Sequence, residues 1–116
     1  MRPPEPVNGA PASLQTLRDE LQPEVLRHSH RILILLAMGV NRRLGFTELM
    51  RLTRLGKGSL SHHLDQLARA GLIRSQNVFT IAGPRVMVEI TPSGDESFQR
   101  LTTTLADLAR HRTGGP

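Results

Sequence analysis

Apolar residues recur at helical spacing over the first third of the chain. Residues 13–22 carry three leucines on one helical stripe, with Ser13 as the expected N-cap and Pro23 as the stop. The segment HSHRILILLAMG follows, and we expect Ser29 to cap its helix and Gly39 to end it. The apolar side chains of this second helix lie on more than one side, which is typical of a buried central helix.

The segment TELMRLTRLGKGSLSHHLDQLARAGLI predicts two helices joined by a tight turn. Thr47 is the expected cap of a short first helix, and Gly56 and Gly58 would supply a turn with positive φ. A second helix is expected from about Ser59 to Ala70, with Gly71 ending it. Its buried face has the i, i+4, i+7 spacing of Leu60, Leu64 and Leu67.

In residues 72–91, apolar and polar residues follow a strand pattern in place of the helical spacing. The segment LIRSQNVFTIAGPRVMVEIT reads as two strands joined by an AGPR turn, and VNRRLGF earlier predicts a turn and a short extended piece. Thr91 and Pro92 then have the residue types that cap and begin a last helix. The order is helix, helix, short helix, turn, helix, hairpin, helix. The expected fold class is therefore mostly α with a β-hairpin wing, a winged helix-turn-helix flanked by N- and C-terminal helices.

The length of 116 residues suits one small domain. The Pro- and Gly-rich start predicts a disordered arm over residues 1–12, followed by a single winged-helix domain over 13–112 and a disordered tail over 113–116. Within the domain we expect a helix-turn-helix at 47–71, a wing at 72–91 and a C-terminal helix at 92–111.

Composition excludes several classes of protein. The chain has no cysteine, which rules out disulfides and thiolate metal sites. Three Phe with no Trp or Tyr argue against the aromatic platforms that bind single strands. The longest apolar run, Ile32–Val40, is far shorter than the ~20 residues that span a bilayer, and the N-terminus lacks the apolar region of a signal peptide. We therefore expect a cytoplasmic protein.

Basic residues gather in the middle of the chain. The net charge is +5, and the segment from Arg27 to Arg85 holds ten basic residues against two acidic ones, while the two ends are acidic. This distribution favours a polyanion as the partner of the middle segment. An ordinary solvated surface is the other interpretation.

The stretch KGSLSHHL, residues 57–64, contains residue types that also serve catalysis and metal binding. A catalytic triad needs converging side chains, whereas neighbours on one helix point apart, so Ser61, His62 and His63 do not form one. Adjacent histidines are likewise a poor metal pair, because helical ligands sit at i, i+4. We expect no enzyme, cofactor or metal site, although a site built across a dimer from His28, His30 or His111 stays an alternative.

Recognition of a nucleic acid is the interpretation that fits this stretch best. With its leucines buried, the opposite face of the helix presents hydroxyls, an imidazole and an amide next to a positive helix start. Hydroxyls and backbone N–H groups bind phosphate there, and Ser, His and Gln side chains can hydrogen-bond base edges in the major groove.

Four segments of the chain resemble one known group of proteins. They are His28–Leu33 (HSHRIL), Phe46–Leu49 (FTEL), Ser59–Ile73 (SLSHHLDQLARAGLI) and Ile90–Gly94 (ITPSG). Together they are similar to the winged helix-turn-helix domain of MarR-type and ArsR-type transcription regulators. The resemblance implies a homodimeric, sequence-specific regulator that binds double-stranded DNA, with an effector that the sequence does not identify. The last helix departs from ArsR-type metal sensors, since it lacks their cysteines.

The resemblance also implies which residues contact DNA. They are expected in the turn and the recognition helix, and in the wing: Arg54, Lys57, Ser59, Ser61, His62, His63, Gln66, Asn77 and Arg85.

Two apolar stripes at the ends of the chain predict a dimer. The last helix carries a 3-4-3 seam like that of a coiled coil, and the first helix carries a second stripe. These dimerisation residues are Leu14, Leu17, Leu21, Phe98, Leu101, Leu105 and Leu108. The alternative is that the two end helices pack together within one chain. A winged helix that docks proteins without binding DNA is the rival function, because a fold does not fix its use.

Overall fold

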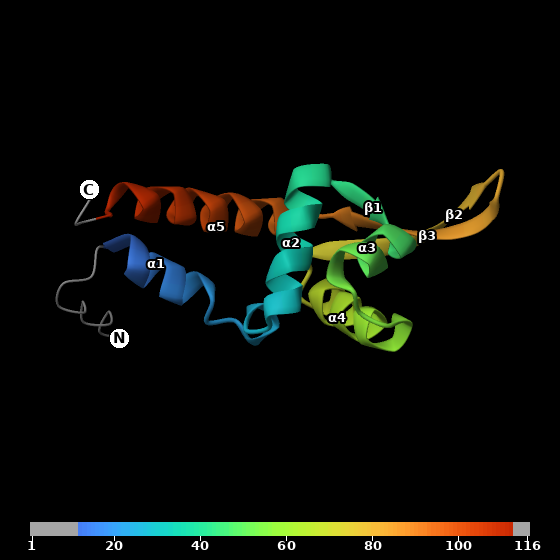
Figure 1. Ribbon diagram of the computed structural model, residues 1–116, viewed down its shortest axis with the longest axis horizontal. Helices are drawn as coiled ribbons and strands as arrows, with labels where there is room; N and C mark the ends of the chain where they lie inside the picture. The colour runs from blue at the N-terminus through green and yellow to red at the C-terminus, as the bar shows by residue number, and fades with distance from the viewer. Residues whose placement is uncertain (1–11, 113–116) are drawn as a thin grey trace.

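The computed structural model describes residues 12–112 and has the predicted winged-helix architecture (Figure 1). Five α-helices, a short 3₁₀ helix and three strands follow one another along these residues. Their bounds are α1 Ala12–Glu20, η1 Glu24–Leu26, α2 Ser29–Asn41, β1 Arg43–Gly45, α3 Phe46–Thr53, α4 Lys57–Arg69, β2 Ile73–Thr80, β3 Gly83–Ile90 and α5 Pro92–Arg110. The tail at 113–116 and residues 1–11 of the expected arm lie outside the described residues, and the expected boundary at residue 12 is wrong because α1 begins at Ala12.

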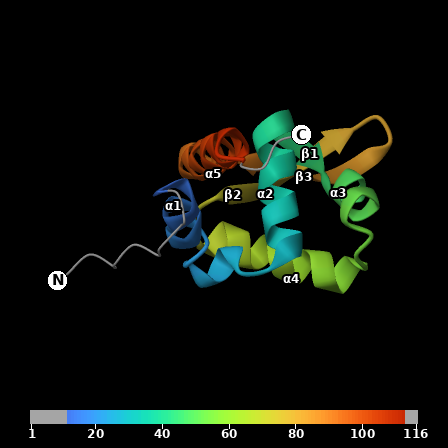
Figure 2. The ribbon, with the colours of Figure 1, turned by 60° about the vertical axis from the view of Figure 1, so that its left-hand side comes forward.

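Helix α2 lies at the centre of the fold, and in Figure 1 α1 and α5 lie on one side of it and α3, α4 and the sheet on the other. Figure 2 shows α4 lying across the first turn of α2. Its side chains Ile34, Leu35 and Met38 have no exposed surface. The predicted buried face of α4 is confirmed: Leu60, Leu64 and Leu67 join the same core as Leu49 of α3 and Ile73 and Val88 of the sheet. Helix α4 is thus held by its apolar face, and its polar face is left to the solvent.

The three strands form an antiparallel sheet in the order β1-β3-β2. The extended piece predicted before α3 is confirmed as β1, which pairs with β3. The predicted AGPR turn is wrong, because Gly83, Pro84 and Arg85 belong to β3 and the hairpin turns at residues 81–82. Thr80 is the last residue of β2 and is paired with Gly83, the first residue of β3. Its hydroxyl donates to the Gly83 carbonyl at 2.8 Å, so the turn begins at residue 81, one residue before the predicted start.

The expected caps are correct at one helix and wrong at three. Thr91 caps α5, and its hydroxyl accepts from the Gly94 N–H at 3.0 Å. Ser13, Ser29 and Thr47 instead lie inside helices, since α2 and α3 have His28 and Gly45 at their N-caps, without a side-chain hydrogen bond. Periodicity does not fix a helix boundary to one residue, so a capping residue type near a helix start does not by itself identify the N-cap.

The glycines have other roles than expected. Gly56 has a φ of −71°, and Gly58 is not among the positive-φ residues. The left-handed residue of the turn is Arg54, whose N–H donates to the Met50 carbonyl at 2.8 Å and ends α3. Gly39 does not end α2, which continues to Asn41. A Cβ on Gly39 would lie 2.0 Å from the ring of Phe98, so this glycine lets α5 pack closely on α2. Gly71 ends α4 with a φ of +79°, as expected.

Helices α1 and α5 lie side by side and form an arm that extends from the winged-helix core (Figure 1). An ion pair joins them, because Arg100 Nε lies 3.0 Å from a carboxylate oxygen of Glu20. Within residues 12–112, no helix has the length and apolar character that crossing a membrane requires.

Candidate nucleic-acid interface

The start of α4 is an open, positive helix end. Lys57, Ser59, Ser61 and His62 are exposed, and the first turn contains no acidic residue. Gly56 precedes the helix without a side-chain cap, so its first N–H groups are left to an outside partner. Such an end attracts anions. The residues that the sequence placed at the front of the helix are therefore at the surface, beside the exposed Arg54.

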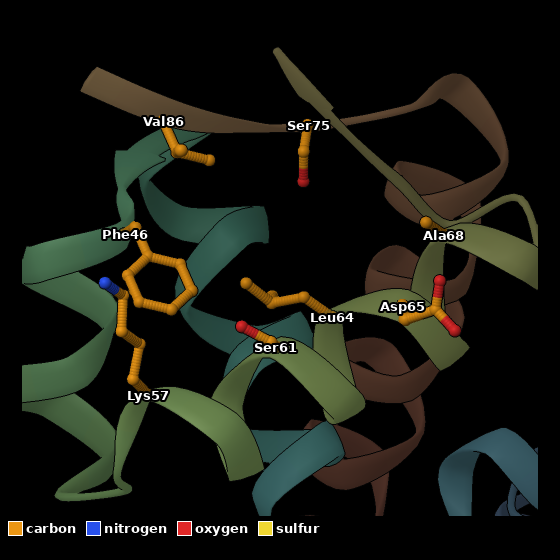
Figure 3. A pocket seen from close by; sticks show the side chains of 8 residues that line it. All are labelled: Phe46, Lys57, Ser61, Leu64, Asp65, Ala68, Ser75 and Val86. Carbon is orange, nitrogen blue, oxygen red and sulfur yellow. The ribbon is translucent and has the colours of Figure 1, made fainter. Parts of the chain in front are cut away.

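Helix α4 has two polar flanks that face different parts of the protein. On the first flank, Lys57, Ser61 and Asp65 line a cavity of about 510 Å³ that the wing covers. Figure 3 shows this cavity between α4, the start of α3 and the sheet, with Ser61 and Ser75 pointing into it. At 100° per residue, Ser59, His63 and Gln66 fall on the other flank, and His62 points straight outward. The exposed face of α4 thus has a wing side and a far side.

The wing carries its two predicted contact residues on opposite faces. Asn77 is paired with Val86 and Arg85 with Val78, and side chains alternate along a strand, so Asn77 and Arg85 point away from each other. Both are exposed. Arg85 lies two residue pairs inside the turn and not at its tip, which follows from the corrected position of the turn.

The tip itself is apolar, a feature that the charge pattern did not indicate. The exposed fraction of Phe79 is 88%, and Ile81 is fully exposed. Apolar residues at the end of a hairpin that reaches beyond its core have nothing of their own chain to pack on.

His63 has a different place from the other predicted contacts. It is half-buried, and its Nδ1 accepts a hydrogen bond from Nε of Arg31 at 3.0 Å. Burial, followed by the positive charge of Arg31, lowers the pKa of the His63 imidazole. His63 is therefore held neutral against α2. Arg31, which is not among the predicted contact residues, is only 5% exposed.

The seven residues predicted to form dimer seams do not share one exposed face. Leu101 is buried and Leu21 packs against the core, whereas Leu14 and Leu105 have exposed fractions of 43% and 42%. The remaining three, Leu17, Phe98 and Leu108, are half-buried. The alternative in which the end helices pack within one chain is part of this structure, because α1 lies on α5.

Metal ligation has no site in the described part of the chain. Among residues 12–112, no three His, Cys, Asp or Glu side chains are placed to share an ion. His111 is at the far end of α5, where its Nε2 lies 3.5 Å from a carboxylate oxygen of Asp107.

Comparisons with known proteins agree with this architecture. A model of the winged helix DNA-binding domain family matches residues 30–109, whereas no curated protein matches the sequence. A transcriptional regulator homologue from Pyrococcus horikoshii is 26% identical, with a TM-score of 0.71 over 83% of this chain and 95% of that chain.

Two further solved structures are similar over most of the chain. A MarR-family regulator from Silicibacter pomeroyi is 26% identical, with a TM-score of 0.57 over 90% of this chain and 70% of that chain. BpsR from Bordetella bronchiseptica, whose DNA binding is regulated by 6-hydroxynicotinic acid, is 15% identical, with a TM-score of 0.61 over 90% and 81%. The first two of these three structures are named as transcriptional regulators, and the third as a protein whose DNA binding is regulated.

We predict that the Arg31–His63 contact makes folding sensitive to mild acid. His63 has a lowered pKa in the folded protein, so below the ordinary value of about 6.5 the unfolded chain takes up a proton that the folded one resists. The free energy of unfolding should fall as the pH drops from 6.5. His63→Asn keeps an acceptor near the position of Nδ1 and cannot titrate. The free energy of unfolding of this variant, measured by urea denaturation, should therefore fall less between pH 6.5 and pH 5 than that of the unmodified protein.

His62→Asn is the matched control, because His62 is the exposed neighbour of His63 on the same helix. It should keep the pH dependence of the unmodified protein. A decline in His63→Asn as steep as that of the unmodified protein would contradict the assignment.

Proposed function

Because the chain belongs to the winged helix DNA-binding domain family, we propose that it is a sequence-specific transcription regulator that binds double-stranded DNA as a homodimer. The observation that carries this proposal is the outer face of α4. Its first two turns present Ser59, Ser61 and His62 to the solvent at an uncapped positive helix end, without an acidic residue in the first turn.

This face suits the major groove of a duplex. The groove is about 12 Å wide and admits one α-helix, whose side chains then reach the base edges. In such a position, Ser61 and His62 would hydrogen-bond bases, while Lys57 and the free N–H groups of the first turn would bind phosphates. Gln66 and Arg54 lie beside this face and complete the surface that the sequence predicted.

The rival function, a protein-docking module, has less support from the same face. The energetic centres of protein interfaces are usually Trp, Tyr and Arg side chains that fill apolar pockets. The outer face of α4 has no aromatic residue and no exposed large apolar residue. Its basic surroundings favour a polyanion.

Homodimerisation is supported by the composition of the arm. The contact between α1 and α5 within one chain includes polar side chains: Ser13 and Thr104 are buried, and the Ser13 hydroxyl has no hydrogen bond of good geometry. Hollows of about 260 and 290 Å³ remain beside this contact. Leu14 and Leu105 remain exposed on these two helices, and a second copy of the chain would cover them.

A small-molecule effector stays a prediction. The cavity between α4 and the wing has the size of common ligand sites, and a molecule bound beside Lys57 and Ser61 would meet the proposed DNA contacts.

We predict that the front of α4 reads bases. Against a duplex selected from random sequences, Ser61→Ala and His62→Ala should each weaken binding by roughly 1–3 kcal/mol, because each removes a base contact. Thermal unfolding should be unchanged, since both side chains are exposed. His111→Ala is the control for His62→Ala and should bind like the unmodified protein. Unchanged affinity of both α4 variants would refute the assignment.

We predict that the wing acts through charge. Arg85→Ala should weaken binding to selected and unselected duplexes about equally and lower the slope of log affinity against log salt by about one, since one phosphate contact is lost. Arg110→Ala removes the same charge at the far end of α5 and should leave the slope nearly unchanged. If the loss at Arg85 depends on sequence and not on salt, then the wing reads bases.

We predict that the exposed leucines of the arm hold the dimer. Leu14→Asp with Leu105→Asp should give a folded monomer by light scattering at micromolar concentration, whereas Leu52→Asp, at a residue of similar exposure on α3, should remain dimeric. In the dimer the two α4 helices should lie roughly 34 Å apart, one turn of DNA, and select a near-palindromic site. The idea fails if the unmodified protein is a monomer that binds such a site without cooperativity.

A further inference from the structure

Arg31 is a buried cation without a carboxylate partner. Its exposed fraction is 5%, and no Asp or Glu within residues 12–112 forms an ion pair with it. Within the same residues the one hydrogen bond of its side chain is the donation from Nε to Nδ1 of His63. Buried arginines are normally paired with an anion, because removing a charge from water is costly. An anion that is not part of this chain would supply the missing partner.

The guanidinium is also accessible at one edge. Among the described residues, only the Ser13 hydroxyl is a fully buried side-chain polar atom without a hydrogen bond. The two Nη groups of Arg31 make no hydrogen bond there either, so they must open onto the surface. Both Nη groups therefore keep some contact with the solvent, the side from which an anion can approach them.

Histidines surround this opening. The ring centroid of His63 lies 5.9 Å from that of His28, 5.8 Å from that of His30 and 5.8 Å from that of His62. His28, His30 and His62 are exposed. Imidazole N–H groups donate hydrogen bonds, and none of these rings is paired with a carboxylate of the described residues. Together the five side chains form a surface that can donate hydrogen bonds to an anion.

The cluster lies on the side of α4 that is far from the wing. Helix α2 begins beside the middle of α4 (Figure 2), and this brings His28, His30 and Arg31 to the flank that carries His63. The wing lies over the opposite flank, at Ser61 and Asp65. The outer face of α4 is thus bordered by the wing on one side and by this cluster on the other.

A helix in the major groove has a phosphate backbone on each side. We propose that Arg31, with His28, His30 and His62 around it, binds a backbone phosphate on the side opposite to the wing. His63 is a positioning residue: its Nδ1 accepts the hydrogen bond from Nε of Arg31, which leaves both Nη groups of Arg31 for the phosphate oxygens. This inference rests on the proposed function, and DNA is favoured over a free phosphate because His62 belongs both to the cluster and to the outer face of α4.

His30→Glu tests the site without disturbing the core. His30 is exposed, and a carboxylate there would give Arg31 the anion that it lacks. The comparison is His111→Glu, which changes the net charge equally at the far end of α5. Binding to a mixed-sequence 24-base-pair duplex is measured over a salt series. Relative to His111→Glu, His30→Glu should bind about tenfold more weakly and have a salt slope lower by about one, because one charged phosphate contact is lost.

Thermal unfolding of both variants shows whether they fold, and His30→Glu should be at least as stable as His111→Glu. If His30→Glu does not fold, His30→Gln with His28→Gln is used against His111→Gln, and a weaker affinity is again expected. Equal affinities and slopes for the matched variants would overturn the inference while leaving DNA binding through α4 intact. If the unmodified protein does not bind the duplex at all, the proposed function itself fails.

Inorganic phosphate distinguishes the source of the anion. Its addition to the unmodified protein, followed through the imidazole NMR signals, should shift those of His28 and His30 only at millimolar concentration. Saturation at micromolar phosphate, with DNA affinity unchanged in His30→Glu, would assign the site to a free phosphorylated molecule and overturn the proposal for DNA.

Discussion

Helix α2 must be surrounded, because its apolar side chains point in several directions, and the rest of the fold is arranged by this requirement. It contacts η1, α3, α4, α5 and the strands β1 and β3. Each of these elements has only one apolar face to offer, so packing against α2 also decides which of its faces is left to the solvent. The polar face of α4 points outward for this reason.

The same packing sorts the histidines by role. His62 and His63 are adjacent in sequence, yet they differ by about 100° around α4. One points into solvent and the other reaches the buried Arg31 across the α2–α4 contact. A short stretch that looks uniform by composition thus divides into an exposed residue that we propose contacts DNA and a half-buried residue that orients an arginine. In the proposed complex, the contact between α2 and α4 orients the Arg31 guanidinium, so the packing of these two helices also determines how strongly Arg31 binds phosphate.

The arm formed by α1 and α5 packs differently from the core around α2. Gly39 lets Phe98 of α5 pack closely on α2, and this contact positions the first turns of α5 against the core. Along the arm, α1 packs on α5, and the Arg100–Glu20 ion pair joins the two helices, a partly exposed kind of contact that contributes little to stability. An arm of this composition is better suited to assembly with another chain than to stabilising its own.

Periodicity by itself determined the element order, the buried face of α4 and the hairpin, because helices and strands repeat every 3.6 and 2 residues whatever surrounds them. The cap of the last helix, Thr91, was also predictable, because a threonine followed by Pro92 is a local signal: the cap hydroxyl bonds an N–H only three residues away. Helix starts at Ser13, Ser29 and Thr47 were missed by a residue or two, and the turn of the wing was misplaced for the same reason: these boundaries depend on which hydrogen bonds close, not on residue type alone. Only the tertiary structure could place His63 against Arg31, 32 positions away, or Phe98 against Gly39. Contacts between distant segments carry no local pattern, so the sequence identified the polar face of α4, and the packing of α2 decided which residues of that face are exposed.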